Sequence, residues 1–248
     1  MKLLFACLIF PFLLSAKISS PKYFEQKTHY KTDFGQCPSK VVGKLALDLV
    51  KVFDNSKSLF SVKKAIIDEK LEEKYFLSSY QIGYDPLLKT LNLNFNCPKP
   101  LMKVQIYKEG GEEYYTAILV DSGELYDPTY EVLLRAENKI KGTLPHMAFP
   151  ASLLDSGEEK KLTSLFNVIG EEFTRNISEV ILNEDKELTI ILSLGRKPSS
   201  AFLGHDQWSE KVDKLDSVIK FMQKKKTIPA VINLTNLKKV VVKFSDTI

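Results

Sequence analysis

Two stretches of strict apolar alternation constrain the fold of this chain most. KTLNLNFN, at residues 89–96, and ELTIILSL, at 187–194, both place an apolar residue at every second position. These positions are Leu91, Leu93 and Phe95 in the first stretch and Leu188, Ile190, Leu192 and Leu194 in the second. Successive side chains of a strand point to opposite faces, so each stretch predicts a strand with one buried and one exposed face.

Apolar residues at helical spacing lie between the strand-like stretches. A helix is predicted through VVGKLALDLVKVF with Ser39 as its cap, and a second around Val62, Ala65, Ile66 and Leu71. Further helices are predicted over 158–173 and after Asp206 as cap. The last of these carries Trp208, Val212, Leu215, Ile219 and Met222.

The order of these patterns predicts an α+β fold in two parts. Residues 22–97 read as strand, helix, helix, strand, strand, and Cys97-Pro-Lys-Pro100 then interrupts the chain. Strand patterns dominate afterwards, with turns at KEGGEE, at DSGELYDP and at 183–186. We therefore expect a small module over 22–98 and a larger mixed-sheet domain over 99–248, with helices on one face.

The N-terminus predicts export from the cytoplasm. Lys2 is followed by an apolar run from Leu3 to Leu14 and then by Ser15-Ala16. The run is shorter than the roughly 20 residues of a spanning helix and contains Pro11, which favours a cleaved signal peptide. For a cut after Ala16, a small residue is also expected at the third position before the cut, and Leu14 at that position is a poor match. Residues 1–21 are therefore either a signal peptide or a short membrane anchor.

Composition and charge narrow the function classes. A hydrophobic fraction of 44% and a charged fraction of 27% are those of a globular protein. The formal net charge of +4 is too small to indicate nucleic-acid binding, and the lysine clusters read as solvated faces.

The reactive residues do not form a recognisable catalytic or metal-binding pattern. His29, His146 and His205 stand more than 50 residues apart, and no metal spacing, phosphate loop or nucleophile elbow occurs. We therefore expect no enzyme activity, no cofactor and no metal. A disulfide between Cys37 and Cys97 is possible in an exported protein, as are two unrelated buried thiols.

The order of motifs resembles that of a known family, the bacterial cell-division protein FtsQ, also called DivIB. AFLG at 201–204, EKVDKLDSVI at 210–219 and VINL at 231–234 followed by KKVVVKF are similar to its C-terminal strands and helix. TLNLNFNCPKPL at 90–101 resembles the end of its POTRA module. AILVDSGELYD resembles the next hairpin, and LPHMAFP the Leu-Pro loop. Asn233 and Thr235 stand where the family has Asp and Arg.

The resemblance implies a non-catalytic periplasmic scaffold held at the inner membrane by a single N-terminal span. The alternative is a protein secreted to the periplasm after signal cleavage. In the family, the last strand and the helix before it recruit small coiled-coil partners (FtsB/DivIC-like and FtsL-like) by strand addition. Contacts with the septal peptidoglycan synthase machinery are also expected.

The terminal run fits such a docking strand. Val240, Val242 and Phe244 share one face of a strand over 239–244, and Val241 and Lys243 the other. Such a β-branched run favours pairing, and the lysines around it would suppress pairing with the wrong strand and attract an acidic partner. The predicted partner-binding residues are Lys239, Val240, Val241, Val242, Lys243, Phe244 and Trp208. An interior strand, paired on both sides, is the other interpretation.

Two other functions stay open at this point. One is an exported POTRA-type binding protein of envelope assembly, which would be expected to show repeated modules or a trailing barrel. The other is an exported hydrolase whose nucleophile pairs Cys37 or Cys97 with His146 or His205.

Overall fold

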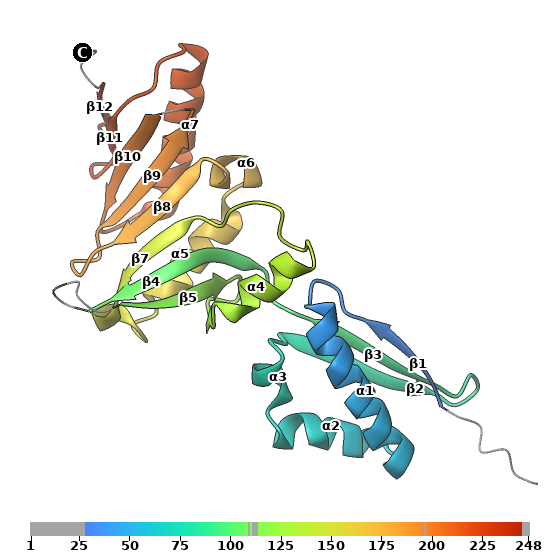
Figure 1. The fold of residues 1–248 in the computed structure, drawn as a ribbon. Coiled ribbons are helices and arrows are strands. Elements are labelled where there is room, and N and C mark those ends of the chain that lie inside the picture. The colour runs from blue at the N-terminus through green and yellow to red at the C-terminus, as the bar shows by residue number, and fades with distance from the viewer. Residues whose placement is uncertain (1–27, 109, 111–113, 196, 245–248) are drawn as a thin grey trace, which may run out of the picture.

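The computed structural model describes residues 28–108, 110, 114–195 and 197–244, and it confirms the α+β fold (Figure 1). A three-stranded sheet lies near the N-terminus, and a nine-stranded mixed sheet is built from the rest of the chain. The predicted export segment within residues 1–21 and most of the predicted KEGGEE turn lie outside the described residues.

The N-terminal module has the predicted order of strand, helix, helix, strand and strand, with one short helix added. Its elements are β1 (His29–Asp33), α1 (Ser39–Ser56), α2 (Leu59–Asp68), α3 (Leu71–Lys74), β2 (Ser79–Asp85) and β3 (Thr90–Asn96). The sheet order is β1-β3-β2, with β1 parallel and β2 antiparallel to the central strand.

The core of this module consists of the apolar residues that recur at helical spacing in α1 and at every second position in β3. Val42, Leu45 and Leu49 of α1 are buried together with Leu91 and Leu93 of β3. The asparagines between those leucines point to the opposite face of the sheet, so the helices cover one face only.

Neither predicted helix cap is correct. The N-cap of α1 is Pro38, which has no side-chain acceptor, and Ser39 is already the first helical residue. The N-cap of the last helix is Gln207, with φ 50°, rather than Asp206. The first turn of α1 is stabilised instead by Glu137, which is distant in the sequence.

The larger sheet has the order β12-β11-β10-β9-β8-β7-β4-β5-β6. Its strands are β4 (Pro100–Tyr107), β5 (Tyr114–Val120), β6 (Leu125–Tyr126), β7 (His146–Pro150), β8 (Ile177–Leu182), β9 (Leu188–Leu194), β10 (Lys197–Gly204), β11 (Val231–Asn233) and β12 (Val241–Lys243). The pairs β4–β7, β7–β8 and β10–β11 are parallel and the remaining pairs are antiparallel.

Two helices pack on this sheet and share its main core. They are α5 (Glu158–Val168) and α7 (Trp208–Lys224), and their buried faces join the inward residues of β4, β8, β9 and β10. The helix predicted over 158–173 is interrupted, because Ile169 is extended and the short α6 (Glu171–Thr174) begins only after Gly170. Glycine is a poor helix former, which accounts for the break.

Several elements of the larger domain were not predicted. LPHMAFP, expected to be a loop, contains β7, which pairs with β4 on one side and β8 on the other. Prolines at 145 and 150 bound this five-residue strand, so its sequence looks like a turn. Helix α4 (Thr129–Ala136), which precedes β7, and the single-turn 3₁₀ helix Ala151–Leu153, which follows it, were not predicted either. The two-residue β6 pairs with β5 within the hairpin expected over AILVDSGELYD. Within the described ranges, no helix is both long and apolar enough to cross a membrane.

Candidate partner-binding edge

The last strand, β12, lies at one edge of the nine-stranded sheet (Figure 1). It pairs antiparallel with β11, with Val242 opposite Ile232, and no described strand lies on its other side. The predicted edge position is therefore confirmed for the described part of the chain. An edge strand leaves one row of backbone N–H and C=O groups without ladder partners.

The strand is shorter than predicted. It covers Val241–Lys243 rather than 239–244, so Lys239 and Val240 precede it and Phe244 follows it. The backbone N–H of Lys239 donates to the carbonyl of Asn236 at 3.1 Å. This turn holds the chain out of extended geometry until Val240.

The side chains at the edge differ in their exposure to solvent. Val240 is half-buried and packs against the main core of the large sheet. Val241 and Phe244 are 38% and 52% exposed. Two apolar side chains at an unpaired edge are surface that an added strand could cover.

Positive charge surrounds this edge. Lys238, Lys239 and Lys243 are all exposed. A fourth lysine, Lys214 of α7, donates to the carbonyl of Leu237 at 2.5 Å and so ties the helix to the loop before β12. An approaching acidic segment would therefore meet positive charge beside β12.

Trp208 has a structural role in addition to its predicted one. It is the first residue of α7, it is half-buried against the main core, and its indole N–H donates to the carbonyl of Gly204 at 2.7 Å. The indole therefore holds the helix to β10.

A buried lysine follows in the same helix. Lys211 is 1% exposed, and its ammonium donates to the Leu203 carbonyl at 2.8 Å and to Asp206 at 2.7 Å. The hydrogen bond from Lys211 and its charge lower the pKa of Asp206. Asp206, predicted as a cap, therefore acts as the counter-ion of Lys211.

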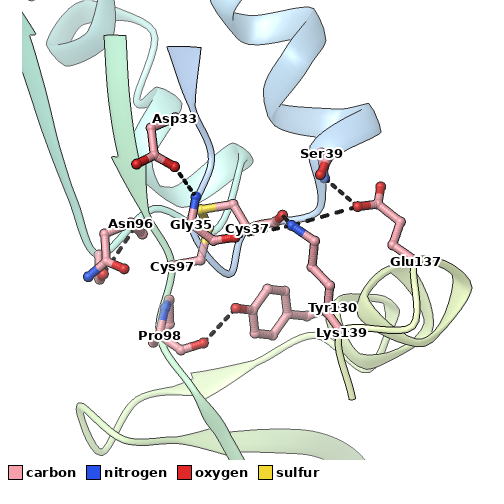
Figure 2. The surroundings of a disulfide bond; sticks show 11 residues. Asp33, Gly35, Cys37, Ser39, Asn96, Cys97, Pro98, Tyr130, Glu137 and Lys139 are labelled. Atoms are coloured by element: carbon pink, nitrogen blue, oxygen red, sulfur yellow. Dashed lines mark hydrogen bonds and ion pairs between the residues drawn. A yellow bond between two sulfur atoms is a disulfide. The ribbon is translucent and has the colours of Figure 1, made fainter. Parts of the chain in front are cut away.

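The structure separates the residues of the catalytic alternative. Cys37 and Cys97 are joined in a disulfide, so neither offers a thiolate while that bond is intact (Figure 2). His146 begins β7 in the larger sheet, and the Nδ1–H of His205 donates to the Asp185 carbonyl at 2.9 Å. Among the described residues, no group of three or more His, Cys, Asp or Glu side chains is placed to hold a metal ion.

A cluster of side chains beside the disulfide was not predicted from the sequence. This cluster connects the end of α4 with the start of α1 and the loop before it. The carboxylate of Glu137, just after α4, accepts from the backbone N–H of Ser39 at 2.6 Å and of Lys40 at 2.9 Å. Lys139 donates to the carbonyls of Cys37 and Gly35 (Figure 2). The contacts span about a hundred positions, and no local pattern signals them.

Tyr130 of α4 completes this cluster. Its ring is fully buried, and its hydroxyl donates to the Pro98 carbonyl at 2.6 Å, one residue after the disulfide (Figure 2). Burial, together with the nearby Tyr126 and Asp121, raises the pKa of Tyr130 well above that of free tyrosine. The phenol therefore stays a hydrogen-bond donor at any physiological pH.

A cleft of about 850 Å³ opens beside the same junction. It lies between α3 and the β5–β6 turn, with Phe76, Leu77 and Tyr126 among its apolar lining residues. Its charged lining residues are Glu72, Glu73, Glu124, Asp127, Asp155, Glu159 and Lys160. Its lining contains no histidine or cysteine, and we assign it no chemistry.

No family model matches this chain, and no curated protein matches its sequence.

Proposed function

We propose that this chain is a non-catalytic scaffold of the bacterial division machinery, of the FtsQ/DivIB type. It stands in the periplasm at the inner membrane, and a coiled-coil partner adds a strand beside β12. The observation that carries this proposal is the position of β12 at the sheet edge, with only β11 beside it among the described strands.

The edge offers a partner three kinds of interaction. An incoming strand satisfies the outer row of backbone groups, which provides affinity whatever the partner sequence. Val241 and Phe244 supply exposed apolar surface, and Lys239 and Lys243 favour an acidic segment. Because β12 has only three residues, the ladder is short and side chains must provide a large share of the binding energy.

Substitution at the edge tests the docking site. Val241→Asp places a carboxylate where the added strand would lie, and Phe244→Ala removes the most exposed apolar side chain of the edge. We expect each to weaken capture of FtsB/DivIC-like partners at least tenfold in a pull-down titration, because interface hot spots are buried apolar anchors.

A matched control separates docking from folding. Val168→Ala changes another exposed valine, at the end of α5, and should leave partner capture and the melting temperature unchanged. The edge variants should also melt in one cooperative transition. If both edge variants capture the partner as well as the unmodified chain does, β12 is not the docking site.

The cellular role has its own test. A fluorescent fusion of the full chain should gather in a ring at mid-cell during division. A uniform envelope signal in dividing cells would contradict a role in the division machinery.

A further inference from the structure

The turn between β2 and β3 presents two leucines to solvent. Leu87 is 91% exposed and Leu88 is 69% exposed, and they are adjacent in the sequence. Single exposed apolar residues are ordinary on protein surfaces, but two neighbours at the tip of a projecting hairpin form a small apolar knob. The core does not require them, because neither belongs to a buried cluster.

This turn is held in shape by hydrogen bonds. The backbone N–H groups of Leu87 and Leu88 donate to Oδ1 of Asp85 at 2.9 and 3.1 Å. The hydroxyl of Thr90 donates to the Leu88 carbonyl at 3.0 Å. These bonds fix the backbone of the turn that carries the two exposed leucines.

The knob lies beside the start of β1. The backbone N–H of His29 donates to the Lys89 carbonyl at 3.1 Å, so the start of β1 lies next to the turn. In Figure 1 the β2–β3 turn and the start of β1 lie at one end of the molecule, and β12 lies at the opposite end.

Positive charge flanks the knob. Lys31 of β1 and Lys89 of the turn are both exposed. Leucine combined with lysine is the composition that favours the boundary between acyl chains and anionic headgroups.

We propose that Leu87 and Leu88 enter the lipid surface beside the N-terminal segment and so orient the module on the membrane. This inference rests on the proposed function, because it takes the apolar run Leu3–Leu14 as an anchor. About 14 residues separate that run from β1, which at roughly 3.3 Å per residue can reach on the order of 45 Å. The contact need not be strong, because the tether keeps the turn at high local concentration near the bilayer.

Fluorescence quenching tests the contact in the full chain. We would reconstitute the chain in vesicles of phosphatidylethanolamine and phosphatidylglycerol with brominated acyl chains, which quench indoles at acyl depth. Leu87→Trp puts a probe at the knob, and Leu47→Trp on α1, 48% exposed, is the matched control. Native Trp208 is present in every variant and provides the background signal.

We expect Leu87→Trp to add blue-shifted emission that brominated lipid quenches, with no added quenching in Leu47→Trp. A vesicle-bound chain with equal quenching in the two variants would overturn this inference and leave the scaffold proposal standing. A blue shift without quenching would place a protein surface at the knob and also overturn it. A chain recovered free of the vesicles would overturn both the anchor and the lipid contact. Partner capture at β12 is tested separately by the pull-down titration.

Discussion

At the scale of single residues, Glu137 connects two parts of the molecule. Helix α1 begins without a side-chain cap of its own, and the carboxylate of Glu137, at the end of α4, takes that place. Burial opposes ionisation of this carboxyl, but the backbone N–H groups of Lys40 and Ser39 outweigh it and lower the pKa of Glu137. A negative charge at a helix N-terminus is also favoured by the helix dipole.

The lowered pKa of Glu137 predicts a pH-dependent contribution to stability. A depressed folded-state pKa stabilises the fold above the unfolded value near 4.5, and this contribution disappears as the pH falls through the folded value. Glu137→Gln should therefore lower the free energy of unfolding by about 1 kcal/mol near neutral pH and by much less in acid. Urea unfolding at a series of pH values measures this, and Glu69→Gln, an exposed glutamate, is the control. An equal loss at every pH would contradict the proposed charge effect.

Lys211 predicts a second residue-scale effect. Lys211→Met keeps the buried stem but leaves the Leu203 carbonyl without its donor, which costs about 1–3 kcal/mol. Thermal unfolding should show the loss, and Lys224→Met, exposed at the end of the same helix, should show almost none. Equal melting temperatures for the two variants would mean that the buried ammonium adds nothing to stability.

At the scale of elements, the disulfide joins the loop before α1 to the end of β3. Cys37 and Cys97 are 60 positions apart, and the loop they close contains all three helices of the module. Its closure restricts the unfolded chain strongly, and both cysteines are buried in the core of the module.

Removal of this bond should destabilise the N-terminal module. The double variant Cys37→Ser, Cys97→Ser should lose about 2–5 kcal/mol of unfolding free energy, measured in urea. The reductant dithiothreitol should shift the unfolding midpoint of the unmodified chain in the same direction and leave the double variant unaffected. A reductant effect on the double variant would show that another thiol, or another process, is responsible.

At the scale of the whole molecule, the two sheets share a core. Ile118 and Val120 of β5 and Tyr130 and Leu134 of α4 are buried in the same cluster as the helices of the N-terminal module. The larger sheet therefore supplies part of the core of the smaller one. Together with Glu137, Lys139 and Tyr130, this packing couples the two parts.

The shared core predicts that the chain unfolds as one unit. Calorimetry should show a single transition for the unmodified chain, and Leu134→Ala should cost about 2–5 kcal/mol, because the side chain is buried at the junction. Val132→Ala, on the exposed side of the same helix, is the control. Two separate transitions in the unmodified chain would show that the junction does not couple the sheets.

Local periodicity explains which elements could be predicted. The alternation in β3 and β9 and the helical spacing in α1 and α7 depend only on neighbouring residues, and all four elements form where expected. Three features were not predicted. The helix expected over 158–173 ends at Val168, because Gly170 is a poor helix former. The terminal strand begins only at Val241, because a turn at Asn236 precedes it, and β7 forms because it pairs with a strand on each side.

By itself, the sequence determined the fold class, the order of strand and helix patterns, and the valine and lysine composition of the terminal edge, because all of these depend on near neighbours. Only the tertiary structure decided which strands stand side by side, that β12 is last in its sheet, and that Glu137 caps a helix 98 positions away. Such contacts depend on how whole faces of helices and sheets pack together. The free energy of that packing is shared among many residues, so no short stretch of sequence encodes the contacts.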